Sequence, residues 1–263
     1  MTGSIKYPRT TRTDNICNLC QKTVKKLSDD HVPPKGGYPI SQVIIQSYPE
    51  GTKEDTFRLH HSSNGLKFKT ICSECNNLLG AKFDEALNEF VNNVAKIASS
   101  PYNVLESFSV EVNPTRVIKA VLAHLLAAKT GECNTTYDKK IRQYIFDDGA
   151  KLPSEFKLYY WYYPYDTVVI SLDKFAYDME SGSSAFFSVL KYYPIAFLLL
   201  CDTTMADKTF CELTKYNHNR MDERVRIPFN FKKRPGNFPE SIQHTSCCLV
   251  PEDHTDLISY KVK

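Results

Sequence analysis

The chain has 263 residues, of which 42% are hydrophobic and 12% aromatic, so it can bury one large core or two ordinary ones, which excludes a disordered protein. The formal net charge of +3 is too small to indicate a partner by itself. The longest apolar run, residues 194–201, is much shorter than the roughly 18 residues of a membrane span, and the polar N-terminus lacks the apolar segment of a signal peptide.

Two Cys-x-x-Cys pairs occur in the first third of the chain, Cys17 with Cys20 and Cys72 with Cys75. Four cysteine sulfurs at this spacing suit one tetrahedral Zn²⁺ with bonds of about 2.3 Å. We therefore expect a structural zinc that staples distant segments together. The chain between the pairs, residues 21–71, exceeds the roughly 15 to 20 residues of a simple zinc ribbon, so a further element lies inside the staple.

The staple is predicted to enclose a hairpin that leads into a helix. Residues 27–32 have strand composition and end at a Pro-Pro pair, which cannot continue a ladder. Residues 65–71 alternate apolar and basic side chains, which predicts a half-buried second strand with Lys67 and Lys69 on the opposite face. From residue 76 to about residue 98, apolar side chains recur at steps of three and four, as in an amphipathic helix.

Asp30 and His31 end the first strand, Pro-Pro and Gly-Gly follow, and Asn76 comes directly after the second cysteine pair. This order, over about residues 14–90, resembles the HNH endonucleases with a ββα-metal fold, in the variant that ends in asparagine. In that family the histidine is the general base, an acidic neighbour and a residue at the helix start hold a divalent cation, and the zinc is structural. The resemblance implies that His31 is the base and that Asp30 and Asn76 hold Mg²⁺ or Mn²⁺.

These residue types suit the hydrolysis of a phosphodiester. A histidine with an ordinary pKa of about 6.5 can activate water near neutral pH, and a cation on oxygen ligands can neutralise the charge that develops on the phosphate. A four-cysteine zinc has no open position, so it is not the catalyst. The candidate nucleic-acid contacts are Lys35, Lys67 and Lys69. Basic strips at residues 1–26 and 215–234 fit phosphate binding and an ordinary solvated surface about equally well.

Several assignments have alternatives. Residues 35–64 form a long connection in which Asn64 is the candidate for the middle asparagine of the family pattern. His60 and His61 in this connection are interpreted as a loop pair, with metal ligation as the alternative. His124 lies on the apolar side of its helix and is interpreted as a core histidine. The run of aromatic residues at 159–163 is interpreted as a strand packed on both faces rather than a platform for bases.

The fold class is predicted as α+β, with an HNH nuclease domain at residues 1–100 and a second domain at residues 101–263. In the second domain, helices are expected at residues 114–131 and 136–146, followed by strands at residues 156–163, 167–172, 185–190, 195–201 and 208–213. Recognition, oligomerisation or docking of a regulatory protein partner is the expected role of this domain.

The sequence therefore favours a metal-dependent endonuclease that cuts DNA, with RNA open as a substrate, in phage defence or restriction. Nine cysteines, four of them in metal spacing, fit a reducing cytoplasm better than a disulfide framework, and Cys247 and Cys248 are interpreted as ordinary thiols. One alternative is a non-catalytic zinc-stapled module that binds nucleic acid, which would leave Asp30 and His31 without a role. A protein-interaction scaffold is the other.

Overall fold

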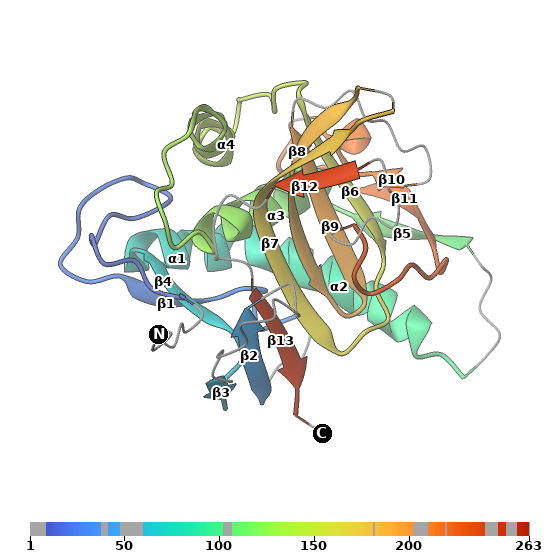
Figure 1. Ribbon diagram of the computed structural model, residues 1–263. Helices are drawn as coiled ribbons and strands as arrows, with labels where there is room; N and C mark the ends of the chain where they lie inside the picture. Colours follow the sequence, from blue (N-terminus) through green and yellow to red (C-terminus); the bar gives the residue numbers. More distant parts are fainter. Residues whose placement is uncertain are drawn as a thin grey trace.

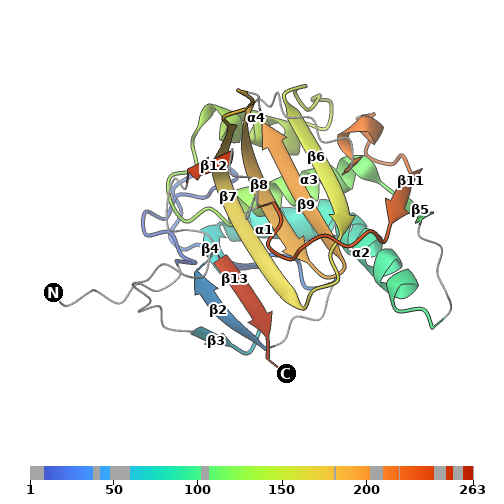
Figure 2. The same cartoon turned by 45° about the vertical axis from the view of Figure 1, so that its right-hand side comes forward.

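The computed structural model describes residues 9–37, 42–47, 60–101, 107–180, 182–201, 210–218, 220–239, 247–250 and 257–262. Helices and strands are mixed, as the α+β prediction requires. Figures 1 and 2 show one large twisted sheet, with helices α2 (Glu85–Ala98) and α3 (Pro114–Ala127) lying across one of its faces. A smaller hairpin lies beside this sheet. In the described part of the chain, no helix is both long and apolar enough to cross a membrane.

The hairpin inside the cysteine staple forms as predicted. Strand β1 (Ser28–His31) pairs antiparallel with β4 (Lys67–Ile71). The chain then continues through α1 (Ser73–Leu79) and a π-helical turn (Gly80–Asp84) into α2. The predicted helix is therefore confirmed, with one wider turn in it. Its apolar stripe is buried, because side chains three and four residues apart share one helix face: Phe83, Leu87, Phe90, Val91 and Val94.

Two short strands occur in the long connection that was expected to be a loop. Strand β2 (Val43–Ser47) pairs with β3 (His60–Ser62) on one side and with β13 (Leu257–Lys261), near the end of the chain, on the other. The loop prediction is wrong for these residues because Val43 and Ile45 are buried in a sheet whose other strands come from distant sequence. The boundary expected at residue 100 stays a prediction, and the pairing of β2 with β13 crosses it.

The described part of the large sheet has the strand order β10-β6-β9-β8-β7-β13-β2-β3, with β12 also paired to β7. The strands not yet introduced are β6 (Phe156–Tyr162), β7 (Thr167–Asp178), β8 (Ser184–Tyr192), β9 (Ile195–Cys201), β10 (Cys211–Glu212) and β12 (Cys247–Val250). Four of the five predicted strands are confirmed, and β7 extends beyond its predicted end. The fifth is described only as β10, because residues 202–209 lie outside the described chain.

The aromatic run in β6 packs on both faces of the sheet, as predicted. Tyr160 stacks on Phe229 and meets Phe90 of α2 edge-on, whereas Trp161 on the other face contacts Phe210. Tyr159, Tyr160 and Trp161 are all less than a tenth exposed, so the strand interpretation is confirmed.

Helix α4 (Thr136–Phe146) has the predicted bounds and begins with a capping box between Thr135 and Asp138. Helix α3 also forms, but it ends at Ala127, earlier than expected. A second small sheet, β5 (Ser107–Val112) with β11 (Val225–Asn230), was not predicted. Strand β11 lies in the second basic strip. Its buried apolar residues alternate there with exposed ones, so its apolar face was not recognised.

Candidate functional site

The two cysteine pairs meet beside the hairpin. The Sγ atoms of Cys17, Cys20, Cys72 and Cys75 all lie within 4.8 Å of one another, and the Sγ atoms of Cys20 and Cys72 are 3.8 Å apart. Sulfurs around a tetrahedral zinc with bonds of about 2.3 Å are separated by about 3.8 Å. The cluster therefore fits a structural metal such as zinc, and the predicted staple is confirmed to that extent.

The thiols of the cluster are close enough to change one another's pKa. A hydrogen bond from the Cys75 thiol lowers the pKa of Cys17 to about 4. The same hydrogen bond, together with burial, raises the pKa of Cys75. Thiols this close share protons because their thiolates repel one another. A bound cation would remove that repulsion and allow all four sulfurs to act as thiolate ligands.

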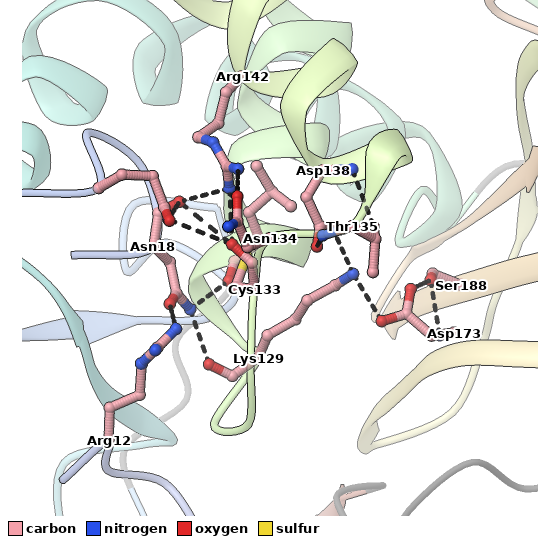
Figure 3. Close-up of polar contacts among 12 residues, drawn as sticks. Arg12, Asn18, Lys129, Cys133, Asn134, Thr135, Asp138, Arg142, Asp173 and Ser188 are labelled. Carbon is pink, nitrogen blue, oxygen red and sulfur yellow. Dashed lines mark hydrogen bonds and ion pairs between the residues drawn. The ribbon is translucent and has the colours of Figure 1, made fainter. Parts of the chain in front are cut away.

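Asn18, next to the first zinc-ligand candidate, anchors this knuckle to the rest of the fold. Its backbone N–H donates to Thr70 O of β4 at 2.9 Å, and its side-chain Nδ2 donates to Leu126 O and Lys129 O, both at 2.7 Å. Figure 3 shows Asn18 between Arg12 and the segment that follows α3. The buried amide thus ties the cysteine staple to α3 and the segment that follows it.

His31 lies on the outer face of the hairpin, paired across the strands with Lys67. Its Nε2 is 3.2 Å from the backbone oxygen of Asn64, so it is the carbonyl of Asn64 that contacts the imidazole. Burial, and then the charges of Lys35 and Lys67, lower the pKa of His31. The ring is therefore neutral at neutral pH. When Nε2–H donates to the carbonyl, Nδ1 is the nitrogen that can accept a proton.

Asp30 points to the opposite face of β1. It pairs with Phe68 across the hairpin, and it is only 4% exposed. The register of β1 shifts between Ser28 and Asp30, but Asp29 contacts Lys69, which lies on the same face of β4 as Lys67, so Asp29 shares the outer face with His31. Asp29 is exposed and forms an ion pair with Lys69 at 3.7 Å. The alternation of side chains along β1 places Asp30 and His31 on opposite faces of the strand.

The inner face of β1 meets His124, which is completely buried in α3. His124 Nε2 lies 3.0 Å from Asp84 Oδ1, and Nδ1 lies 3.6 Å from Asp30 Oδ2. Burial alone would lower the pKa of His124, but Asp84 and Asp30 raise it to about 10. The core interpretation is confirmed, and the two carboxylates were missed. A histidine inside an apolar helix must find a polar partner, but this signal does not say which one.

The donor atoms near β1 fit a divalent cation in part. Asp30 Oδ2 is buried and has no hydrogen bond among the described residues, although His124 Nδ1 lies 3.6 Å away as an ion-pair partner. Asn76 Nδ2 donates to Ser28 Oγ at 3.2 Å and to Asp29 O at 3.0 Å. These bonds tie the first turn of α1 to β1. The amide oxygen Oδ1 is therefore the atom of Asn76 that can be a ligand.

Basic side chains surround the outer face of the hairpin. Lys67 and Lys69 are half-buried along β4, and Lys35 is exposed in the segment after β1. The predicted alternation in β4 is confirmed, because Phe68 between the two lysines is fully buried. His60 and His61 are exposed on β3, the last strand of the large sheet, so they form a strand and not the expected loop.

The site thus consists of a four-cysteine cluster, a hairpin with His31 on one face and Asp30 on the other, and the helix that carries Asn76. Helix α3 and the residues directly after it contribute His124 and the carbonyl groups that hold Asn18. In comparisons with known proteins, no family model matches this chain, and neither a curated protein nor a solved structure does.

Proposed function

We propose that the protein is a metal-dependent endonuclease of the HNH type that hydrolyses phosphodiester bonds in DNA. The observation that carries this proposal is the setting of His31, a half-buried imidazole with a lowered pKa, oriented by the carbonyl of Asn64 and flanked by Lys35 and Lys67. A neutral, oriented imidazole can act as a general base by taking a proton from the water that attacks a phosphodiester. The cationic groups beside it can bind the phosphate.

The residues of the hairpin have separate roles in this proposal. His31 Nδ1 takes a proton from the attacking water, and Lys35 and Lys67 neutralise phosphate oxygens. Asp30 and Asn76 Oδ1 would hold Mg²⁺ or Mn²⁺, which would stabilise the charge on the leaving oxygen. Asp30 Oδ2 has no hydrogen bond among the described residues, but it forms an ion pair with His124, so a cation bound there would take the place of that contact. The four-cysteine cluster keeps the hairpin against α1.

A second candidate is a zinc-stapled module that binds nucleic acid without cutting it. This candidate is favoured by the position of Asp30, which is buried against His124 on the face of β1 away from His31. The lysines of β4 and the cysteine cluster would have the same roles in either case. The two candidates differ only in whether His31 and a divalent cation cleave the bound nucleic acid.

The experiment that separates them is nicking of supercoiled plasmid across a series of Mn²⁺ concentrations. His31→Ala should reduce cleavage by about 100- to 10,000-fold, as loss of a general base does, while zinc content, circular dichroism and DNA binding stay as in the wild type. Asp30→Asn should raise the Mn²⁺ concentration needed for cleavage, because it weakens an oxygen ligand.

Asp29→Asn is the matched control, since Asp29 is the exposed neighbour that pairs with Lys69, and it should retain most activity. Loss of the Mn²⁺ response in Asp29→Asn alone would assign the cation to the outer face of β1. Full activity in His31→Ala would overturn the proposed base. Wild-type protein that binds DNA but cuts neither DNA nor RNA with Mg²⁺ or Mn²⁺ would establish the binding module instead.

A further inference from the structure

A cavity of about 290 Å³ lies between the helices α3 and α4 and the strands β7, β8 and β9. Its apolar walls include Leu125 of α3, Ile141 of α4, Phe186 of β8 and Leu199 of β9, and its polar end is formed by Lys129 and Asp173. The volume is roughly twice that of an engineered cavity of about 150 Å³ that binds benzene. None of these residues belongs to the cysteine cluster or to the outer face of the hairpin.

The polar end holds one ammonium group between two carboxylates. Lys129 Nζ lies 2.7 Å from Asp138 Oδ1 and 2.6 Å from Asp173 Oδ2, as Figure 3 shows. Lys129 is only 8% exposed. Burial alone would lower its pKa, but Asp173 and Asp138 raise it, so Lys129 stays charged. At this end of the cavity, two carboxylates therefore contact one ammonium group.

The two carboxylates differ in how firmly their oxygens are held. Asp138 uses Oδ1 for Lys129 and Oδ2 for the backbone N–H of Thr135, at 2.9 Å. Asp173 uses Oδ2 for Lys129, while its Oδ1 is 3.5 Å from Ser188 Oγ, at the limit of a hydrogen bond. The Asp173 side chain is 43% exposed. Asp173 Oδ1 can therefore accept a hydrogen bond from a donor in the cavity.

The backbone around Asp173 has an unusual conformation that directs this carboxylate. Asp173 has a φ of 51°, in the left-handed region that residues other than glycine seldom adopt. The pairing of β7 with β8 shifts register between Ser171 and Lys174, which is the mark of a bulge, and Ser188 Oγ accepts from the N–H of Asp173 at 3.0 Å. Bulges of this kind re-aim side chains next to functional sites.

An ion pair that merely joins the helices to the sheet would not require this cavity. Protein interiors are close-packed, and voids much larger than a water molecule are few. A largely apolar cavity with a small number of convergent polar groups is instead the usual form of a small-molecule site. The partly exposed carboxylate of Asp173, with an oxygen that can accept a further hydrogen bond, selects a ligand that brings a positive charge and hydrogen-bond donors.

We propose that this cavity binds a small aromatic amine, with its ring system between Leu125, Phe186 and Leu199 and its ammonium group donating to Asp173 Oδ1. This site is independent of the proposed nuclease function. It is nevertheless close to the cysteine cluster in the hydrogen-bond network, because the carbonyl of Lys129 accepts from Asn18, the neighbour of Cys17.

The test uses the full-length zinc-loaded protein and two probes that share an indole ring, tryptamine and indole-3-propionate. Isothermal titration calorimetry should give saturable one-to-one binding of tryptamine. This binding should be at least about tenfold tighter than that of the propionate, because the ammonium group forms a charge-assisted hydrogen bond with Asp173 whereas the carboxylate of the propionate is repelled by it. No saturable binding of tryptamine to folded protein would overturn the proposal. Equal or tighter binding of the propionate would also overturn it.

Two variants locate the binding. Thr136→Trp changes an exposed residue that lines the cavity at the start of α4, and it should abolish tryptamine binding without disturbing the core. Asp173→Asn should weaken the binding of tryptamine by about tenfold and remove the preference for tryptamine over the propionate. Lys139→Trp, at an exposed position of the same helix, is the matched control and should bind as the wild type does. Unchanged binding in Thr136→Trp would place the amine elsewhere and refute the site.

Discussion

Two histidines lie on the two faces of strand β1, His31 in the strand itself and His124 in the helix α3 that packs against it. Their pKa values shift in opposite directions. On the outer face, burial and two lysines lower the pKa of half-buried His31. On the inner face, His124 is completely buried, yet Asp84 and Asp30 raise its pKa to about 10. Burial disfavours the charged form of both rings. The sign of the neighbouring charges therefore decides which histidine is neutral and able to act as a base, and which is a cation that holds carboxylates in place.

Loss of the zinc should unfold the hairpin and thereby disrupt the contacts on both faces of β1. This is the largest effect we expect. Cys72→Ser should lose the metal and unfold the hairpin, because structural zinc contributes about 10 to 16 kcal/mol in zinc-finger peptides. Metal analysis and circular dichroism check the result. Cys211→Ser, a free cysteine outside the cluster, should keep both zinc and fold. A folded Cys72→Ser protein without zinc would show that the hairpin does not depend on the metal.

The inner face should contribute far more to stability than the outer face. His124→Gln leaves buried Asp30 and partly buried Asp84 without their cation, and breaking a buried charge pair costs about 3 to 5 kcal/mol. His31→Gln loses only a half-exposed contact to a carbonyl and should change the free energy of unfolding by about 1 kcal/mol or less. Urea unfolding of both variants at pH 7 measures the difference. Equal destabilisation would mean that His124 carries no charge in the folded protein.

The same pair predicts how stability depends on pH. His124 binds its proton more tightly in the folded chain, so its contribution is fully present below the ordinary pKa of about 6.5 and is lost as the pH rises to about 10. The unfolding free energy should fall over that window by at most about 1.4 kcal/mol per pH unit. In His124→Gln this fall should be smaller. An identical slope in the variant would assign it to other groups.

On the outer face, the charges of the lysines should be measurable at His31. Lys67→Gln removes one cause of the lowered pKa, so the pKa of His31 should rise towards 6.5 by a few tenths of a unit. If His31 is the base, the acid limb of the cleavage profile should move to higher pH by the same amount. NMR titration of the ring checks this without any need for activity. Lys139→Gln, on α4, should leave the titration unchanged.

The smallest effect concerns phosphate contacts along β4. If Lys67 and Lys69 contact DNA, changing both to alanine should weaken binding to all sequences and reduce the salt slope of log K by up to about two units. Lys69 already pairs with Asp29, so its share should be the smaller one. Fluorescence anisotropy at several salt concentrations gives the slope. A slope equal to that of the wild type would place both lysines away from the DNA.

Local patterns were enough to predict most of the elements that carry the site. The Cys-x-x-Cys spacing predicted the cluster, the alternation in residues 65–71 predicted β4, and the apolar stripe predicted α2. These features are readable because each depends on residues within one turn, one strand or one loop. The bounds of α4 also agree with the prediction, and the capping box at its start is a local feature.

The sequence by itself thus determined the staple, the hairpin and the helices. Only the tertiary structure decided that β2 pairs with β13 and that His124 lies between Asp30 and Asp84. Strand pairing and buried charge pairs join residues far apart in the chain, and a single sequence carries no signal of which distant partner is chosen. The faces of β1 acquire their different chemistry only when α3 packs against one of them.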